Sequence, residues 1–411
     1  MDAVTLGAAK AASDRKTMRA NASNVATRIF GGRMGTFNNI TANTFQVTTE
    51  LAAEFDAVRI IFASTDTGIS HSIRSAAVSV MADKSDLNNS SGTWVTATRA
   101  GMTRIYAELA PGTGRIAYTV SDWINISSVA RTDGGTKPLI VARAFMQGSS
   151  ALPVYGDGTD NFTNWATRTD GRLWAARNQA GVAVTSGFTS TTNASQSPIV
   201  GFQYLARGKV ITVAGVGDSI TDGRGTYLGE GFVMPAVEAL SSSTLAFEYM
   251  NCGWSGQTML TYAERAIDIM ESAIKPDILV IPVGSPNDTV STITAANITA
   301  FRAQKSRVLA AARRHGVPVV LWTELPTNTS VRPYGATDAL RTAYNAEVLA
   351  SAAKGVTVVD TAAVVSGATS GGQVQMLASS TTDNIHPNDA GNALLTSVIK
   401  AGILQAAKAA R

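Results

Sequence analysis

Ser219 has the surroundings of a nucleophile. It follows a strand-like run, residues 209–216 (KVITVAGV), in the tripeptide Gly217-Asp218-Ser219. A serine at a strand-to-helix turn has an exposed hydroxyl, and a backbone N–H near a helix N-terminus can stabilise the oxyanion that its attack creates. Asp218 and Ser219 are also residue types that cap helices, so the tripeptide alone leaves both interpretations open.

His386 is the histidine best placed to act as a base. It lies in the pentapeptide DNIHP (383–387), with a carboxylate three residues before it and a rigid proline after it. Asp383 can therefore hold one ring nitrogen while the other faces a nucleophile. A helix-entry role is the alternative. His315 is typical of a helix C-terminus, and His71 lies in a β-rich stretch.

Two further loops supply neutral hydrogen-bond donors. Gly256 lies in a glycine-rich turn (251–258, NCGWSGQT), and Asn287 lies in the segment GSPND (284–288). A backbone N–H of Gly256 and the side-chain amide of Asn287 can both donate to an oxyanion without titrating. Read without these roles, both segments are ordinary turns. Cys252 has no partner pattern that supports a cysteine nucleophile.

The elements that must position these residues form an α/β pattern. Strand-like runs that are apolar on both faces alternate with helix-length segments, which indicates a parallel sheet covered on both sides, a three-layer α/β/α domain. Ligands bind such sheets at the carboxyl ends of the strands, where Ser219, Gly256 and Asn287 stand. The expected strands are 209–216, 244–250, 277–283, 317–323 and 356–360, and the expected helices are 232–240, 261–274, 298–314 and 337–353.

The preceding part of the chain has a different pattern of apolar and turn residues. Between about residues 45 and 200, short runs rich in Val, Ile, Thr, Tyr and Trp alternate with turn residues, which favours an antiparallel sandwich or jelly roll. We therefore expect three parts: a lead-in at 1–44 with no assigned structure, a β-sandwich accessory domain at 45–204, and an α/β catalytic domain at 205–411.

Composition excludes several classes of function. The chain of 411 residues carries 34 Lys and Arg against 30 Asp and Glu, without a basic run that could follow phosphates, so nucleic-acid binding has little support. No apolar stretch reaches membrane-spanning length, and the opening MDAVTLGAAKAASDRK lacks the apolar core of a secretory signal. We expect a soluble protein, inside the cell or exported or virion-associated by another route. One cysteine permits no internal disulfide.

Taken together and in this order, the four motifs resemble the SGNH (GDSL-type) hydrolase superfamily over about residues 205–411. Its four named positions fall on Ser219, Gly256, Asn287 and His386. The resemblance implies a flavodoxin-like fold and a serine hydrolase that works through an acyl-enzyme, without metal or cofactor.

The resemblance also implies roles for these residues. Ser219 would attack the ester carbonyl, His386 would take its proton, and Asp383 would orient the imidazolium. The oxyanion would be held by the N–H groups of Ser219 and Gly256 and by the Asn287 amide. Among the charged residues, Asp218 and Asp288 are expected to shape the neighbouring loops. The third motif departs from the family pattern, because Ser285 stands where glycine is usual.

A β-sandwich ahead of such a domain resembles two-domain carbohydrate esterases, so the expected partner is an ester substrate, an acetylated glycan. The alternatives are a lipase or carboxylesterase acting on longer chains, and an inert glycan-binding or tail-fibre-like module. An oligomer is compatible with the sequence. Core packing is favoured over sugar stacking for Trp94, Trp123, Trp165 and Trp174, and a turn over a Ca²⁺ loop for residues 157–161.

Overall fold

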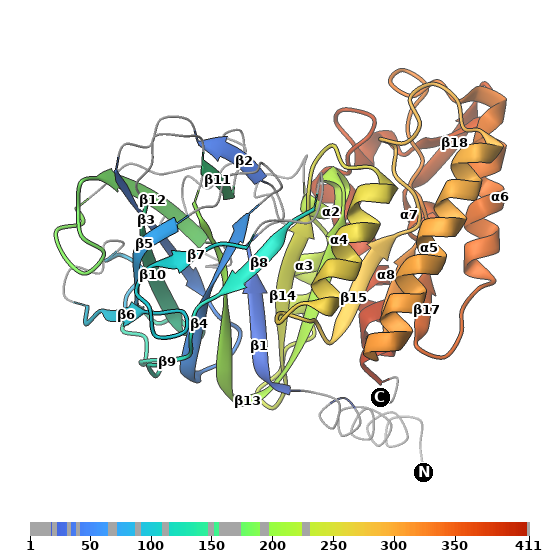
Figure 1. Cartoon of the computed structure of the whole chain (residues 1–411). Helices are drawn as coiled ribbons and strands as arrows, with labels where there is room; N and C mark the ends of the chain where they lie inside the picture. Colours follow the sequence, from blue (N-terminus) through green and yellow to red (C-terminus); the bar gives the residue numbers. More distant parts are fainter. Residues whose placement is uncertain are drawn as a thin grey trace, which may run out of the picture.

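The computed structural model describes residue 18 and residues 23–30, 34–37, 42–64, 72–86, 92–108, 115–146, 152–155, 174–189, 197–223 and 231–408 (Figure 1). Four residues or segments considered above lie outside these ranges or lack a described side chain: His71, the segment 157–161, Trp165 and the side chain of Trp174.

The C-terminal part is a parallel sheet covered by helices on both faces. Its strands are β14 (Ala246–Gly253), the second half of β13 (Ile199–Gly217), β15 (Ile278–Pro282), β16 (Val319–Trp322) and β17 (Val356–Val359), in that order. All four neighbouring pairs are parallel. The predicted α/β/α arrangement is confirmed.

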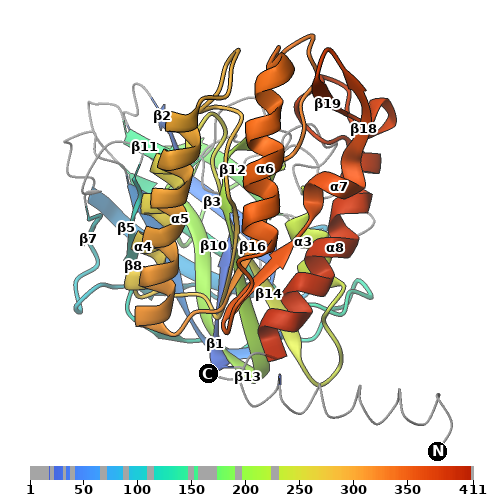
Figure 2. The same ribbon diagram turned by 90° about the vertical axis from the view of Figure 1, so that its right-hand side faces the viewer.

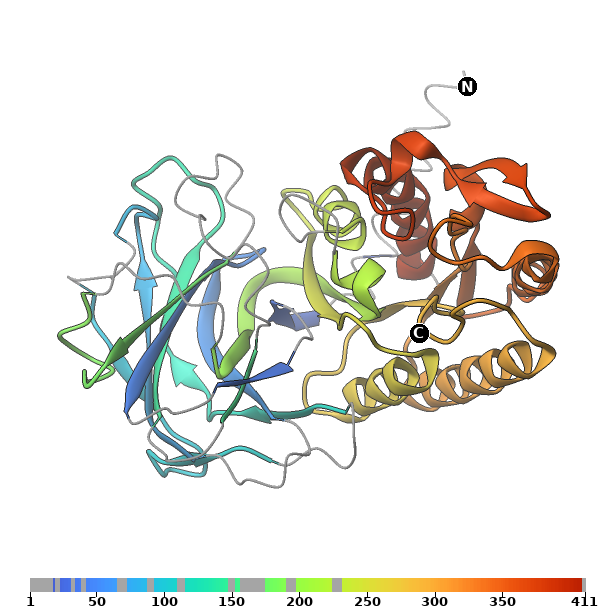
Figure 3. The ribbon, with the colours of Figure 1, turned by 90° about the horizontal axis from the view of Figure 1, so that it is seen from above.

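Two groups of helices form the outer layers (Figure 2 and Figure 3). One face of the sheet carries α4 (Met259–Glu271), α5 (Ala295–His315) and α6 (Asp338–Leu349), and the other carries α3 (Val233–Glu238), α7 (Thr361–Val365) and α8 (Asp389–Lys408). Among the described helices, none combines the length and the apolar character needed to span a bilayer.

Burial on both faces explains why these strands are apolar throughout. In β15, Leu279 and Ile281 face the core beneath α4 and α5, whereas Ile278 and Val280 face the core beneath α3 and α8. Successive side chains of a strand point to opposite faces, so a doubly covered strand needs apolar residues at every position. The carboxyl ends of these strands are therefore set by two packed cores.

The preceding part is an antiparallel, β-rich region. One of its layers is a sheet ordered β12 (Trp174–Ala180), β3 (Asn43–Glu50), β10 (Leu139–Met146), β5 (Ser72–Met81) and β6 (Val95–Ala97), with β7 (Ile105–Tyr106) also on β5. The other layer is built from β4 (Phe55–Ser64), β8 (Ala117–Val120), β9 (Ile124–Asn125), β1 (Ser23–Ile29) and the first half of β13. A short pair, β2 (Met34–Phe37) and β11 (Leu152–Tyr155), lies beside them. The jelly-roll topology stays a prediction.

Strand β13 connects the two parts. Its first half pairs antiparallel with β1 and β4, and its second half pairs parallel with β14 and β15. The expected boundary between residues 204 and 205 falls inside this strand. Strand β1 comes from the expected lead-in and also pairs with β14. A single sheet therefore continues from the β-rich region into the α/β domain.

A buried carboxylate strengthens this junction. Glu248 of β14 accepts hydrogen bonds from Arg28 of β1, from the Tyr204 hydroxyl of β13 and from the backbone N–H of Ala52, at 3.2, 2.7 and 2.9 Å. Both Arg28 and Glu248 are buried, so the charges compensate each other. The β-rich region is thus joined to the α/β part by backbone pairing and by ionic contact.

Two of the tryptophans can be assessed. Trp94 packs on Met81, Leu139 and Val141 and stacks on Arg143, whose guanidinium lies 3.9 Å from the ring centre, so the core expectation is confirmed. For Trp123 it is wrong: this side chain, next to β9 at the edge of the sheet, is 42% exposed. The Arg59 guanidinium lies 4.9 Å from the centre of its ring.

The junction predicts a sharp difference between two glycines of β13. Gly201 pairs with Ile29, and a Cβ there would overlap the backbone oxygen of Arg28, so Gly201→Ala should lower the free energy of unfolding by about 1–3 kcal/mol. Gly208 has open space around it, so Gly208→Ala should be neutral or slightly stabilising. Urea unfolding of both variants measures this, and equal effects would contradict the close approach of β1 and β13.

Candidate active site

The turn after β13 both caps a helix and presents a serine. Helix α2 (Ser219–Asp222) begins directly after Asp218, whose Oδ1 accepts a hydrogen bond from the Ile220 N–H at 2.9 Å. Gly217 permits the tight turn, since a Cβ there would overlap the Thr221 hydroxyl. The two interpretations of the Gly-Asp-Ser tripeptide are therefore compatible, because capping by Asp218 fixes where Ser219 points.

The structure brings Ser219, His386 and Asp383 together. The Ser219 Oγ lies 2.8 Å from His386 Nε2, and His386 Nδ1 lies 2.6 Å from Asp383 Oδ2. Ser219 and His386 stand 167 residues apart in the chain. Such a chain of hydrogen bonds, with a carboxylate on the far ring nitrogen, is the arrangement that activates a serine for attack.

Asp383 is held in its charged form. Its Oδ1 accepts hydrogen bonds from the backbone N–H groups of Ile385 and His386, at 3.0 and 2.8 Å. Partial burial acts to raise its pKa, but these hydrogen bonds and the contact with the His386 ring outweigh it and lower the pKa below its ordinary value. A carboxylate that stays ionised can orient the imidazole and stabilise an imidazolium.

The loop between Asp383 and His386 depends on Asn328, which sequence reasoning missed. Asn384 adopts a positive φ of 68°, which is unusual for a residue other than glycine. Asn328 donates to it twice, from its backbone N–H to Asn384 O at 3.0 Å and from its amide to Asn384 Oδ1 at 2.7 Å. No local motif marks Asn328 in the sequence, because its partner lies 56 residues away.

The turns that carry Gly256 and Asn287 contact each other and the serine turn. Gly256 has a φ of 81°, a conformation that favours glycine. The Asn287 amide donates to Gln257 O at 3.0 Å, and the Trp254 N–H donates to Gly217 O at 3.0 Å. The turns that carry Ser219, Gly256 and Asn287 therefore lie together after β13, β14 and β15, and His386 joins them through its contact with Ser219.

Ser285, which replaces the usual glycine, contacts the serine turn. Its hydroxyl donates to Asp218 Oδ2 at 2.5 Å, and its oxygen accepts from the Asn287 N–H at 3.2 Å. Both Ser285 and Asp218 are buried. The departure from the family pattern thus provides a partner for the buried Asp218 carboxylate and links the first motif to the third.

A group of buried carboxyls lies behind this site. Burial raises the pKa of Asp218, against hydrogen bonds from Ser285 and Ile220. Burial also raises the pKa of Asp288 to about 6, although Asp288 accepts a hydrogen bond from Met259 N at the start of α4. Asp218 and Asp288 thus each accept a hydrogen bond from a backbone N–H at the start of a helix, and their expected role in shaping the loops stays a prediction.

Glu324 belongs to the same group; it directly follows the expected strand 317–323, but no motif marks it in the sequence. Burial raises its pKa to about 8, opposed by Arg341 and reinforced by Asp288 and Asp218. Within the described ranges, its Oε2 has no hydrogen-bond partner. In the same ranges, no group of three or more His, Cys, Asp or Glu side chains is arranged to hold a metal ion.

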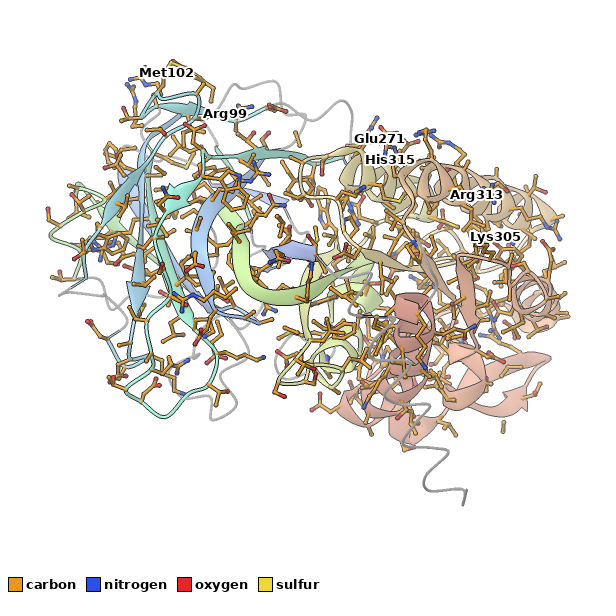
Figure 4. All side chains as sticks on the ribbon, turned by 90° about the horizontal axis from the view of Figure 1, so that it is seen from below. Arg99, Met102, Glu271, Lys305, Arg313 and His315 are labelled. Atoms are coloured by element: carbon orange, nitrogen blue, oxygen red, sulfur yellow. The ribbon has the colours of Figure 1, made fainter. Side chains whose placement is uncertain are left out.

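The remaining described histidine lies away from the site. His315 is the last residue of α5, followed by Gly316 with a φ of 65°, and its ring faces Glu271 of α4 at 3.8 Å (Figure 4). The expectation of an ordinary helix C-terminus is confirmed.

The fold and the site define a class of protein, a three-layer α/β hydrolase with a serine at the end of its first parallel strand. Residues 216–394, a little under half of the chain, match the GDSL-like Lipase/Acylhydrolase family. This match places the similarity to GDSL-like acylhydrolases in the C-terminal part of the chain.

Several solved structures are similar to parts of the chain. A GDSL-like lipase from Bacteroides thetaiotaomicron is 22% identical, with a TM-score of 0.37, over 47% of this chain and 88% of its own. A family 3 carbohydrate esterase from Talaromyces cellulolyticus is 20% identical, with a TM-score of 0.35, over 48% and 98%. A salicylyl-acyltransferase from a tetracycline biosynthetic pathway is 12% identical, with a TM-score of 0.35, over 88% and 82%. No curated protein matches the chain.

The buried Glu324 carboxyl predicts a pH-dependent stability. Its pKa rises from 4.5 to about 8 on folding, so between these two pH values the folded chain binds one proton that the unfolded chain has lost. The free energy of unfolding therefore falls as pH rises through this range, by at most about 1.4 kcal/mol per pH unit. Glu324→Gln should remove this part of the slope and be more stable than the wild type above pH 8. Urea unfolding across this range measures it.

Glu347→Gln is the matched control, because Glu347 is an exposed partner of Arg302 whose hydrogen bonds lower its pKa. That variant should keep the wild-type slope above pH 5. If the free energy of unfolding of Glu324→Gln depends on pH as that of the wild type does, the inference that Glu324 is protonated in the folded chain is wrong.

Proposed function

We propose that this protein is a serine esterase that hydrolyses short-chain acyl esters, with acetylated carbohydrate as its substrate class. The observation that carries the proposal is the chain of hydrogen bonds from Ser219 through His386 to Asp383, at 2.8 and 2.6 Å. It lies at the carboxyl end of β13, in a domain of the GDSL-like acylhydrolase family.

The first half of the proposed reaction forms an acyl-enzyme. Ser219 Oγ attacks the ester carbonyl while His386 Nε2 takes its proton, and Asp383 stabilises the resulting imidazolium. The tetrahedral oxyanion accepts hydrogen bonds from the N–H groups of Ser219 and Gly256 and from the Asn287 amide. When the carbon–oxygen bond to the alcohol breaks, His386 returns the proton to the leaving alkoxide.

The second half releases the acid. Water enters where the alcohol has left, His386 takes one of its protons, and the new oxyanion uses the same three donors. Collapse of this intermediate breaks the ester bond to Ser219, and His386 reprotonates the serine. The enzyme is regenerated without any change in oxidation state, so the cycle requires only water as co-substrate.

A carbohydrate substrate is favoured by features outside the reacting atoms. Trp123 on the β-rich region is 42% exposed, and an exposed indole ring can stack on a sugar ring. The proposed oxyanion donors are neutral, which suits an uncharged ester. The layout, a β-rich region ahead of the hydrolase domain, also supports the proposal.

Loss of the nucleophile tests the reaction. Ser219→Ala should abolish release of acetate from p-nitrophenyl acetate, by about a thousandfold or more, because the nucleophile is removed. Circular dichroism checks that the variant is folded, and Ser291→Ala, at an exposed serine, should leave the rate unchanged. Retention of most activity by folded Ser219→Ala would refute the esterase proposal and favour an inert module.

A chain-length profile tests the substrate class. We expect p-nitrophenyl acetate to be hydrolysed with a kcat/KM at least about tenfold above the octanoyl ester, and acetylated xylan or another acetylated polysaccharide to release acetate. Trp123→Ala should weaken hydrolysis of the polysaccharide and leave p-nitrophenyl acetate unaffected. Faster turnover of the octanoyl ester would contradict the proposal and identify a lipase-like enzyme.

A further inference from the structure

Arg265 of α4 lies beneath the serine turn. It is only 1% exposed, and its Nη2 donates to the Gly217 carbonyl oxygen at 2.7 Å. The same oxygen accepts the Trp254 N–H at 3.0 Å, and the Arg265 guanidinium lies 5.4 Å from the centre of the Trp254 ring. One buried arginine therefore contacts both the turn that leads to Ser219 and the turn that leads to Gly256.

Packing alone does not account for a guanidinium in this place. Its Nε and Nη1 have no hydrogen-bond partner in the part of the chain that the structure describes. A buried cation with unused donors costs free energy compared with an apolar side chain of the same volume. Asp218 and Asp222 lie close enough for their charges to stabilise it. The position of Arg265 is therefore better explained by the hydrogen bond that it donates to Gly217 than by a contribution to the free energy of unfolding.

The β-rich region completes this arrangement. Tyr118 of β8 pairs with Ala63 of β4, and its buried hydroxyl lies beside the Cys252 thiol and near Arg265. Burial raises the pKa of Cys252 to about 12, so the thiol is neutral. Close by, Arg115 forms an ion pair with Asp268 of α4. Strand β8 therefore lies against α4 (Figure 1 and Figure 3).

We propose that Arg265 is a positioning residue that clamps the Gly217 and Trp254 turns together, and that the β-rich region supports this clamp through Tyr118. The inference rests on the proposed esterase function, and it gives the β-rich region a role in the reaction besides substrate binding. Through the two turns, Arg265 sets the distance between the Ser219 hydroxyl and the Gly256 N–H. It touches neither the substrate nor the reacting atoms.

Conservative variants test the clamp by kinetics with p-nitrophenyl acetate. Arg265→Lys keeps the charge and loses the second donor arm, and should lower kcat about tenfold. Arg265→Met should lower it about a hundredfold, as misplaced reacting groups do. Tyr118→Phe should lower it about threefold. KM should stay within about threefold, because the clamp acts on the turns and not on the substrate.

Two matched controls separate positioning from general packing. Arg143→Lys makes the same change at an equally buried arginine of the β-rich region, and Tyr106→Phe removes a hydroxyl from an exposed tyrosine. Both should keep the wild-type kcat. If folded Arg265→Lys and Tyr118→Phe also keep the wild-type kcat, the clamp is refuted.

Amide hydrogen exchange provides a second readout that does not need activity. In the Arg265 variants, exchange should become faster in peptides covering residues 214–223 and 250–258 and stay unchanged in α8. Unchanged exchange in both turns would overturn the proposal. If the wild type hydrolyses no ester, the proposed function is refuted, and the hydrogen-exchange result alone shows whether Arg265 holds the two turns together. If Arg265→Met does not fold, Arg265→Lys and Tyr118→Phe decide it.

Discussion

The continuous pairing of β13 is the constraint on which the rest of the structure depends. Its first half belongs to the antiparallel layer with β1 and β4, and its second half belongs to the parallel sheet with β14 and β15. The strand ends at Gly217, directly before Asp218 and Ser219. The position of the serine is therefore determined by hydrogen bonds from both parts of the molecule. The buried ionic contact at Glu248 lies where these two parts meet.

Much of the hydrolase part could be predicted because its determinants are local. Strands such as residues 278–282 are apolar at every position, and this pattern is explained by the two cores that enclose them. The motif residues Ser219, Gly256, Asn287 and His386 stand at turns whose residue types reflect backbone needs, such as the positive φ of Gly256. Each of these signals lies within a few residues of the feature that it predicts.

The features that could not be predicted depend on contacts between residues that are distant in the sequence. Nothing near Ser285 shows that it donates to Asp218, 67 residues away, and nothing near Asn328 shows that it holds Asn384. Glu324 stands at the carboxyl end of an expected strand but in no motif, and its burial depends on residues that are distant in the sequence, such as Arg341. The pairing of β1 was hidden by the weak periodicity of the first residues, and the exposure of Trp123 depends on its place at a sheet edge.

The single cysteine has a consequence for where this fold can persist. Cys252 is buried in β14 and remains a neutral thiol, because burial raises its pKa to about 12. With one cysteine in the sequence there is no internal disulfide to reduce, and a buried neutral thiol is a poor target for oxidation. The free energy of unfolding should therefore be the same in a reducing and in an oxidising environment.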